Sequence, residues 1–68
     1  MTNTNELKAW MARRGVTQED CAKAIKRTPR TMSERMKTGV FDSDEIEALV
    51  KYLGIDDPIP VFFPDWVT

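Results

Sequence analysis

The sequence predicts a single compact all-α domain, residues 1–68, of four or five helices with an extended, aromatic C-terminal tail. Apolar residues recur at helical spacing in four successive segments, and three of those segments stop at a glycine: Gly15, Gly39 and Gly54. The length suffices for one domain and leaves no room for a second. The single cysteine, Cys21, cannot form an internal disulfide, and a small domain without disulfides is typical of a reducing compartment, so we expect a cytoplasmic protein.

The first two helices are predicted from their apolar stripes and their start signals. One covers about residues 5–14, and its inward face carries Leu7, Trp10 and Met11. The next follows Thr17, a good N-cap, with Asp20 three residues later at the position that completes a capping box. Its buried edge is expected to contain Cys21, Ala22 and Ile25.

The third helix has the clearest start in the chain. Thr28 can cap it, and Pro29 at the first helical position has no amide hydrogen to leave unbonded. Two methionines then face the core, Met32 and Met36. The fourth helix follows Asp42, with Glu45 as its capping-box partner, and its apolar residues recur at helical spacing: Ile46, Leu49, Val50 and Leu53.

The tail, residues 56–68, combines three prolines with large apolar side chains. Proline at that density excludes a long helix, while the apolar side chains need burial, so we expect an extended segment laid over the helices. An exposed aromatic residue there would make a strong interface anchor. The candidates for contact with another protein are Phe62, Phe63 and Trp66.

Charge is unevenly distributed along the chain, although the net charge is only −1. Residues 13–37 contain eight basic and three acidic side chains, a net charge of +5, whereas residues 38–68 contain one basic and seven acidic side chains, a net charge of −6. A polyanionic partner would therefore be attracted to one part of the molecule and repelled by the other.

Residues 17–37 have the dimensions of a DNA-binding helix-turn-helix, in which the second helix enters the major groove. With the two methionines facing inward, Arg30, Ser33 and Glu34 lie on the outward side, where they can reach base edges. Arg30 suits a bidentate contact with guanine, and Glu34 could accept from cytosine or orient Arg30 as an i,i+4 pair. Phosphate contacts are expected from the polar and basic side chains around these helices: Arg14, Thr17, Gln18, Lys26, Arg27, Thr28, Arg35 and Lys37.

Two stretches, residues 15–22 (GVTQEDCA) and 28–33 (TPRTMS), resemble the Xre or lambda-repressor-like helix-turn-helix family. The likeness covers roughly residues 6–55. Within that family the chain is similar to short phage Cro-like regulators, through its length, the segment 53–57 (LGIDD) and the Phe62-Phe63 pair. The resemblance implies a lambda-repressor-like fold, a double-stranded DNA operator as partner and control of transcription.

Residue by residue, the resemblance places Gln18 on the family's phosphate-binding glutamine and Ala22 on its small helix-packing residue. It places the base-reading role on Pro29, Arg30, Ser33 and Glu34. The chain departs from the family at the turn, where Lys26 stands in place of the usual glycine and Arg27 in place of an aliphatic residue. A lysine there is expected to strain the turn or change its length.

Another class of function stays open. The acidic, aromatic C-terminal half could make the chain an antirepressor, a modulator or an antitoxin that binds a partner repressor or a second copy of itself. An antitoxin would share the same DNA-binding surface.

Catalysis is not expected. The chain has no histidine, no nucleophile–base pair, no phosphate-binding glycine loop and no cluster of metal ligands, so we expect neither enzyme activity nor a cofactor or metal. The acidic residues 42–47 are interpreted as favourable charge at a helix start, and Cys21 as a small buried apolar residue. No apolar run approaches membrane-spanning length, so no membrane partner is expected.

Overall fold

The structure, a computed structural model, describes residues 1–66, in which all regular secondary structure is helical and there is no strand. The elements in chain order are α1 (Thr4–Arg14), α2 (Gln18–Ala24), α3 (Pro29–Thr38), α4 (Ser43–Leu53), α5 (Ile59–Phe62) and a single 3-10 turn, η1 (Pro64–Trp66). The prediction of a small all-α domain is therefore confirmed, with five α-helices in the described part of the chain. None of these helices has the length and apolar composition needed to cross a membrane.

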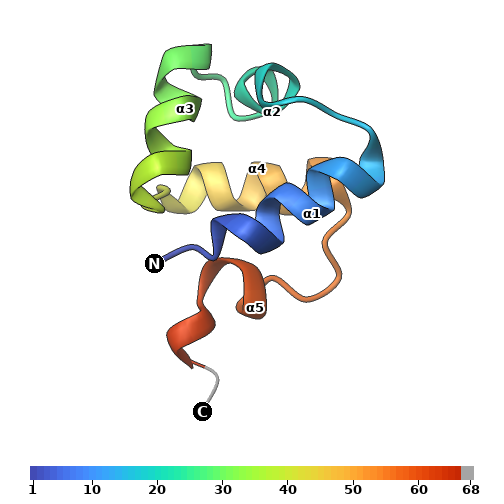
Figure 1. Cartoon of the computed structure of the whole chain (residues 1–68), viewed down its shortest axis with the longest axis vertical. Helices are drawn as coiled ribbons and strands as arrows, with labels where there is room; N and C mark the ends of the chain where they lie inside the picture. The colour runs from blue at the N-terminus through green and yellow to red at the C-terminus, as the bar shows by residue number, and fades with distance from the viewer. Residues whose placement is uncertain (67–68) are drawn as a thin grey trace.

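The helices are stacked along the long dimension of the molecule, which measures 34 Å (Figure 1). Helices α2 and α3 pack against each other at one end, α4 and α1 cross the middle, and α5 with η1 forms the other end. Helix α4 packs on α2 and α1, and α5 packs on α1. The α2–α3 pair is therefore displayed at the end of the molecule farthest from α5 and η1.

The helix ends form where the capping residues predict them. The Thr17 hydroxyl accepts from the Asp20 amide at 3.2 Å while the Asp20 carboxylate accepts from the Thr17 amide at 2.9 Å, which completes the capping box of α2. The Thr28 hydroxyl accepts from the Thr31 amide at the start of α3. All three glycines follow the last residue of a helix in the left-handed conformation, as predicted.

The core collects the predicted inward faces of α1 to α4. Met32 and Leu49 are fully buried, and no buried side-chain nitrogen or oxygen in the described residues lacks a hydrogen-bond partner. The other buried apolar residues are Leu7, Met11, Cys21, Ala22, Ile25, Met36, Leu53, Ile55, Val61 and Phe62. Trp10, Ile46 and Val50 are only half-buried at the edge of this cluster.

The prediction of an extended tail is wrong. Residues 59–62 form the short helix α5, whose prolines stand at its start, where a missing amide hydrogen costs little. Val61 and Phe62 are 1% and 2% exposed, and the Asn3 amide donates to the Val61 carbonyl at 2.7 Å. The tail is therefore helical over residues 59–62 and adds Val61 and Phe62 to the core, whereas η1 lies at the surface; residues 67–68 lie outside the described part of the chain.

Candidate nucleic-acid interface

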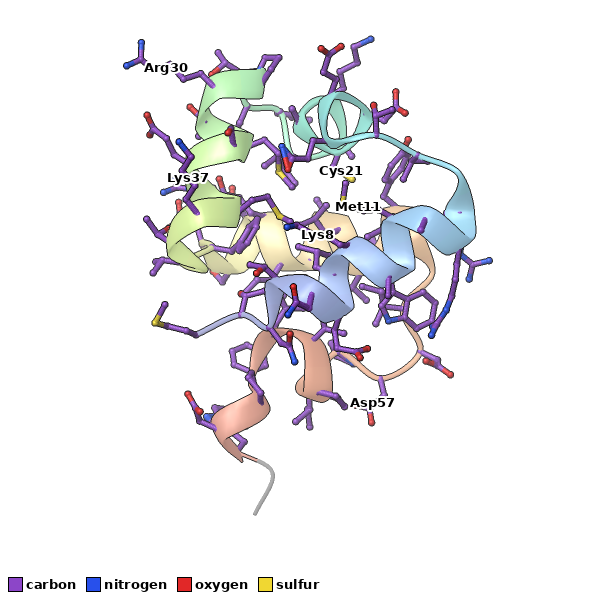
Figure 2. All side chains as sticks on the ribbon, in the orientation of Figure 1. Lys8, Met11, Cys21, Arg30, Lys37 and Asp57 are labelled. Carbon is purple, nitrogen blue, oxygen red and sulfur yellow. The ribbon has the colours of Figure 1, made fainter. Side chains whose placement is uncertain are left out.

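The outward face of α3 carries the residues predicted to read bases. The Arg30 and Glu34 side chains are 90% and 65% exposed, whereas Met32 and Met36 on the opposite face are buried. Pro29 is exposed at the first position of the helix, and Ser33 is half-buried. In Figure 2, Arg30 projects from α3 away from the body of the molecule, and Lys37 lies on the outer side of the same helix.

The predicted i,i+4 pair on this face forms. The Arg30 Nε lies 3.6 Å from the Glu34 Oε1, which places the guanidinium beside the carboxylate at the N-terminal half of α3. An exposed pair of this length contributes at most about 1 kcal/mol. Glu34 therefore biases the direction of Arg30 without holding it firmly.

The turn between α2 and α3 is built around Lys26, which has a φ of +59°. It is the one non-glycine residue with positive φ in residues 1–66. Its amide donates to the Lys23 carbonyl, and the next amide, of Arg27, donates to the Ala22 carbonyl at 2.9 Å. The turn thus keeps a left-handed backbone at the place where the resemblance expects glycine, and the lysine bears the steric cost.

Two predicted phosphate contacts are exposed lysines beside α3. Lys26 lies before the helix and Lys37 in its last turn, and neither takes part in an ion pair within residues 1–66. Gln18 is half-buried at the first position of α2. The hydroxyls of Thr17 and Thr28 are engaged as helix caps, so their phosphate contacts would have to be made in addition to capping.

Arg14, for which a phosphate contact is predicted, also has partners within the protein. Its Nε donates to the Leu53 carbonyl at 2.7 Å, and its guanidinium carbon lies 5.6 Å from the centre of the Trp10 ring. The unpaired carbonyls at the end of a helix attract cations, so this contact ties α1 to the end of α4. The structure therefore uses Arg14 within the fold.

Arg27 and Arg35 also have partners inside the molecule. Both guanidinium groups contact Glu45, a fully buried residue of α4, with Nε–carboxylate distances of 3.1 Å. Asp44 and Asp42 lie on their outer edges, at 3.3 Å from Arg27 and 3.5 Å from Arg35. We define these five side chains as the Glu45 network.

This network was not predicted from the sequence, where Glu45 was interpreted only as a capping-box partner and as favourable charge at a helix start. That bond does form, with the Asp42 amide donating to the Glu45 Oε1 at 2.8 Å. One signal was present: Arg35 stands three residues after Met32 and one before Met36, at the edge of the buried stripe. An arginine in that register faces the neighbouring helix as readily as solvent.

The aromatic residues of the tail have three different environments. Phe62 belongs to the core, edge-on to Phe41 with ring centres 6.0 Å apart. Phe63 is half-buried and stacks on Trp66 at 4.9 Å, and Trp66 itself is 72% exposed. A shallow apolar pocket of about 250 Å³ lies next to this stack, lined in part by Val40, Phe41 and Phe63. Of the three predicted interface residues, Trp66 is the one on the open surface.

Cys21 lies in the core, as predicted. Its side chain is fully buried, and burial raises the pKa of the thiol to about 11. Within residues 1–66, no group of three histidine, cysteine or carboxylate side chains is arranged to hold a metal ion.

The exposed face of α3, the turn before it and the start of α2 together form one surface that could meet a polyanion. Comparisons of the chain with protein-family models, with curated proteins and with solved structures give no match. The case for a function therefore depends on the residues of this surface.

Proposed function

We propose that the chain is a sequence-specific double-stranded DNA-binding regulator of transcription, a Cro-like repressor of phage type, which inserts α3 into the major groove. The observation that supports it is the division of α3 into two faces. Met32 and Met36 are buried on one face, while Arg30 and Glu34 are exposed on the other. A pair of short helices with this division, displayed at one end of a domain, is the arrangement by which helix-turn-helix proteins read bases.

Arg30 is the principal base-reading residue in this proposal. It is the second residue of α3 and extends into solvent, so its planar fork can reach the N7 and O6 acceptors of a guanine. Because the Glu34 pair is exposed and weak, breaking it for a base contact costs little. Glu34 is then free to accept from the amino group of a cytosine.

Lys26 and Lys37 supply charge for the phosphates, with Gln18 as a neutral contact. The two lysines stand at opposite ends of α3, so they can contact the backbone on both sides of the bases that the helix reads. The exposed Asp57 lies towards the other end of the molecule from Arg30 (Figure 2). This separation favours one orientation on the duplex.

Selection of bound duplexes from a random pool, followed by titration of the recovered site at several salt concentrations, tests the proposal. We expect one recovered motif and binding that weakens steeply with salt. Arg30→Ala should relax the base preference, and Lys37→Ala should reduce the salt slope by about 0.9, the contribution of one phosphate contact. The matched control is Lys51→Ala, which removes an exposed lysine of α4 that pairs with Glu47. Equal binding to recovered and scrambled duplexes would contradict sequence reading.

A second candidate is a protein-interaction module, an antirepressor, modulator or antitoxin. The exposed Trp66 beside the apolar pocket favours it, because exposed tryptophans often anchor interfaces. Trp66→Ala should then change the mass of the particle in sedimentation or abolish binding to a partner, while DNA binding stays as in the wild type. A monomer that is unaffected by this substitution and binds DNA normally would exclude this role for Trp66.

A further inference from the structure

Glu45 is the only fully buried charged side chain in residues 1–66. A buried carboxylate is unfavourable unless its oxygens are paired and hydrogen-bonded. Here the Oε1 accepts from the Asp42 amide at 2.8 Å and lies 3.1 Å from the Arg35 Nε. The Oε2 lies 3.1 Å from the Arg27 Nε and accepts from the Arg35 Nε at 3.4 Å. One carboxylate thus bridges two arginines.

Through these two arginines, Glu45 attaches α3 and the turn before it to α4 at two separate points. Arg27 lies two residues before the helix begins at Pro29, and Arg35 lies in the second half of the helix. The N-cap and first turn of α4 supply every acidic partner in the network, since Asp44 pairs with Arg27 and the N-cap Asp42 with Arg35. Attachment at two points restricts both the tilt of α3 and its rotation about its own axis, which attachment at one point would not.

Nothing else polar in the described residues joins α3 to α4 so directly. The backbone of α3 approaches that of α2 closely but makes few close approaches to α4. Replacing a buried ion pair with apolar side chains often leaves stability unchanged or increases it, so stability alone does not account for the network. A network of this kind can instead select one arrangement of the helices.

We propose that Glu45 is a positioning residue for base reading: through Arg27 and Arg35 it sets the orientation in which α3 presents Arg30 and Ser33 to DNA. This inference rests on the proposed DNA-binding function for its consequence, although its structural part concerns the free protein. It also gives Arg27 and Arg35 a role that differs from the phosphate contact predicted from the sequence.

The test compares three variants with the wild type. Glu45→Gln keeps the shape of the side chain but turns an amide group towards an arginine. The double variant R27K/R35K keeps every charge and removes only the planar fork that bridges the carboxylate. The control, Glu47→Gln, removes one negative charge from the exposed side of the same helix, so it reproduces the general electrostatic effect of Glu45→Gln.

Two quantities are measured on each protein. Residual dipolar couplings report the angle between α3 and α4 in the absence of DNA, and titrations report the ratio of affinities for the selected and a scrambled duplex. We expect Glu45→Gln and R27K/R35K to change the angle and to lower the ratio about tenfold, the order of one lost base contact. Glu47→Gln should match the wild type in both.

An unchanged angle in the folded variants would overturn the inference. If Glu45→Gln does not fold, R27K/R35K decides the question, because it leaves the charges of the network in place. A changed angle with an unchanged affinity ratio would also overturn it, since the orientation of α3 would then not govern base reading. If the wild type binds no duplex at all, the proposed function fails, and the couplings still decide whether Glu45 orients α3.

Discussion

Lys26 shows how a single residue can retain an unfavourable conformation inside a motif. Its φ of +59° lies in the left-handed region, where a side chain with a Cβ atom costs about 1–2 kcal/mol relative to glycine. The α2–α3 turn nevertheless keeps the bonds that close it, including the one from the Arg27 amide to the Ala22 carbonyl. A lysine at this place therefore lowers the stability of the folded turn but adds a positive charge beside α3.

Lys26→Gly should stabilise the protein by up to about 1 kcal/mol, because the gain in the folded turn exceeds the extra chain entropy of glycine in the unfolded state. Urea unfolding measures the difference. Lys26→Ala is the control, since it removes the same amine but keeps a Cβ atom. Both variants should lose the same phosphate contact and bind DNA equally weakly. A glycine variant no more stable than the alanine variant would show that the turn is not strained.

Cys21 should be protected in the folded protein, because its thiol is buried and has a pKa of about 11. At pH 8 an alkylating reagent should react with it only as fast as the domain unfolds. The shift also links stability to pH: the pKa is raised above its ordinary value of 9.0, so the contribution of Cys21 is complete below pH 9 and decreases as the pH rises towards 11. The difference in urea stability between wild type and Cys21→Ala at pH 8 and pH 10.5 isolates this contribution. Alkylation of the folded protein at the rate of a free cysteine would contradict the predicted protection of Cys21.

At the scale of the elements, α1 to α4 are predictable from sequence because their ends obey local rules. Thr17, Thr28 and Asp42 begin α2, α3 and α4, and glycines end α1, α3 and α4, whereas α2 ends at Ala24 without a glycine. Helix α5 was not predictable in this way, because four residues contain too little periodicity and its prolines resemble a break. Only the burial of Val61 and Phe62 against other helices explains it.

The same distinction applies to the candidate site. The exposure of Arg30 and Glu34 follows from the spacing of two methionines on one helix, so the sequence predicts it. The partners of Arg14, Arg27 and Arg35 depend on how separate helices pack, and no rule of spacing along one helix gives them. The count of basic residues alone therefore does not show which of them are paired within the protein.

Thr28→Ala should destabilise the protein by about 1 kcal/mol, because the Thr31 amide loses its acceptor at the start of α3. Chemical denaturation gives the free energy, and amide exchange of residues 30–32 reports fraying of the first turn directly. Thr28→Ser keeps the hydroxyl and should differ from the wild type by less than about 0.5 kcal/mol. Equal losses in both variants would show that the hydroxyl does not cap the helix.

At the scale of the whole molecule, the chain divides into a basic end formed by α2 and α3 and an acidic C-terminal half whose last helix closes the core. Helix α5 packs on α1, and the Asn3 amide bonds to its Val61 carbonyl, so the two ends of the described chain are joined. Removing the tail would therefore open the core as well as delete a surface. Point substitutions separate these effects.

Phe62→Ala should cost about 3–5 kcal/mol, because it empties a buried aromatic site next to Phe41. In so small a domain this is comparable with the total stability, so thermal unfolding followed by circular dichroism should show a partly unfolded protein at 25 °C. Trp66→Ala, four residues later on the surface, should change stability by no more than about 1 kcal/mol. Similar losses in the two variants would place Trp66 in the core or Phe62 outside it.

In the proposed complex the exposed face of α3 meets the DNA. This contact can be tested by titrating the isotope-labelled protein with the selected duplex and following the chemical shifts of the amides and arginine side chains. We expect the largest changes at Arg30, Ser33, Glu34 and Lys37, with smaller ones at Gln18 and Lys26, and none at Trp66. Shifts confined to α4, α5 and η1, or no saturable shifts at all, would contradict it.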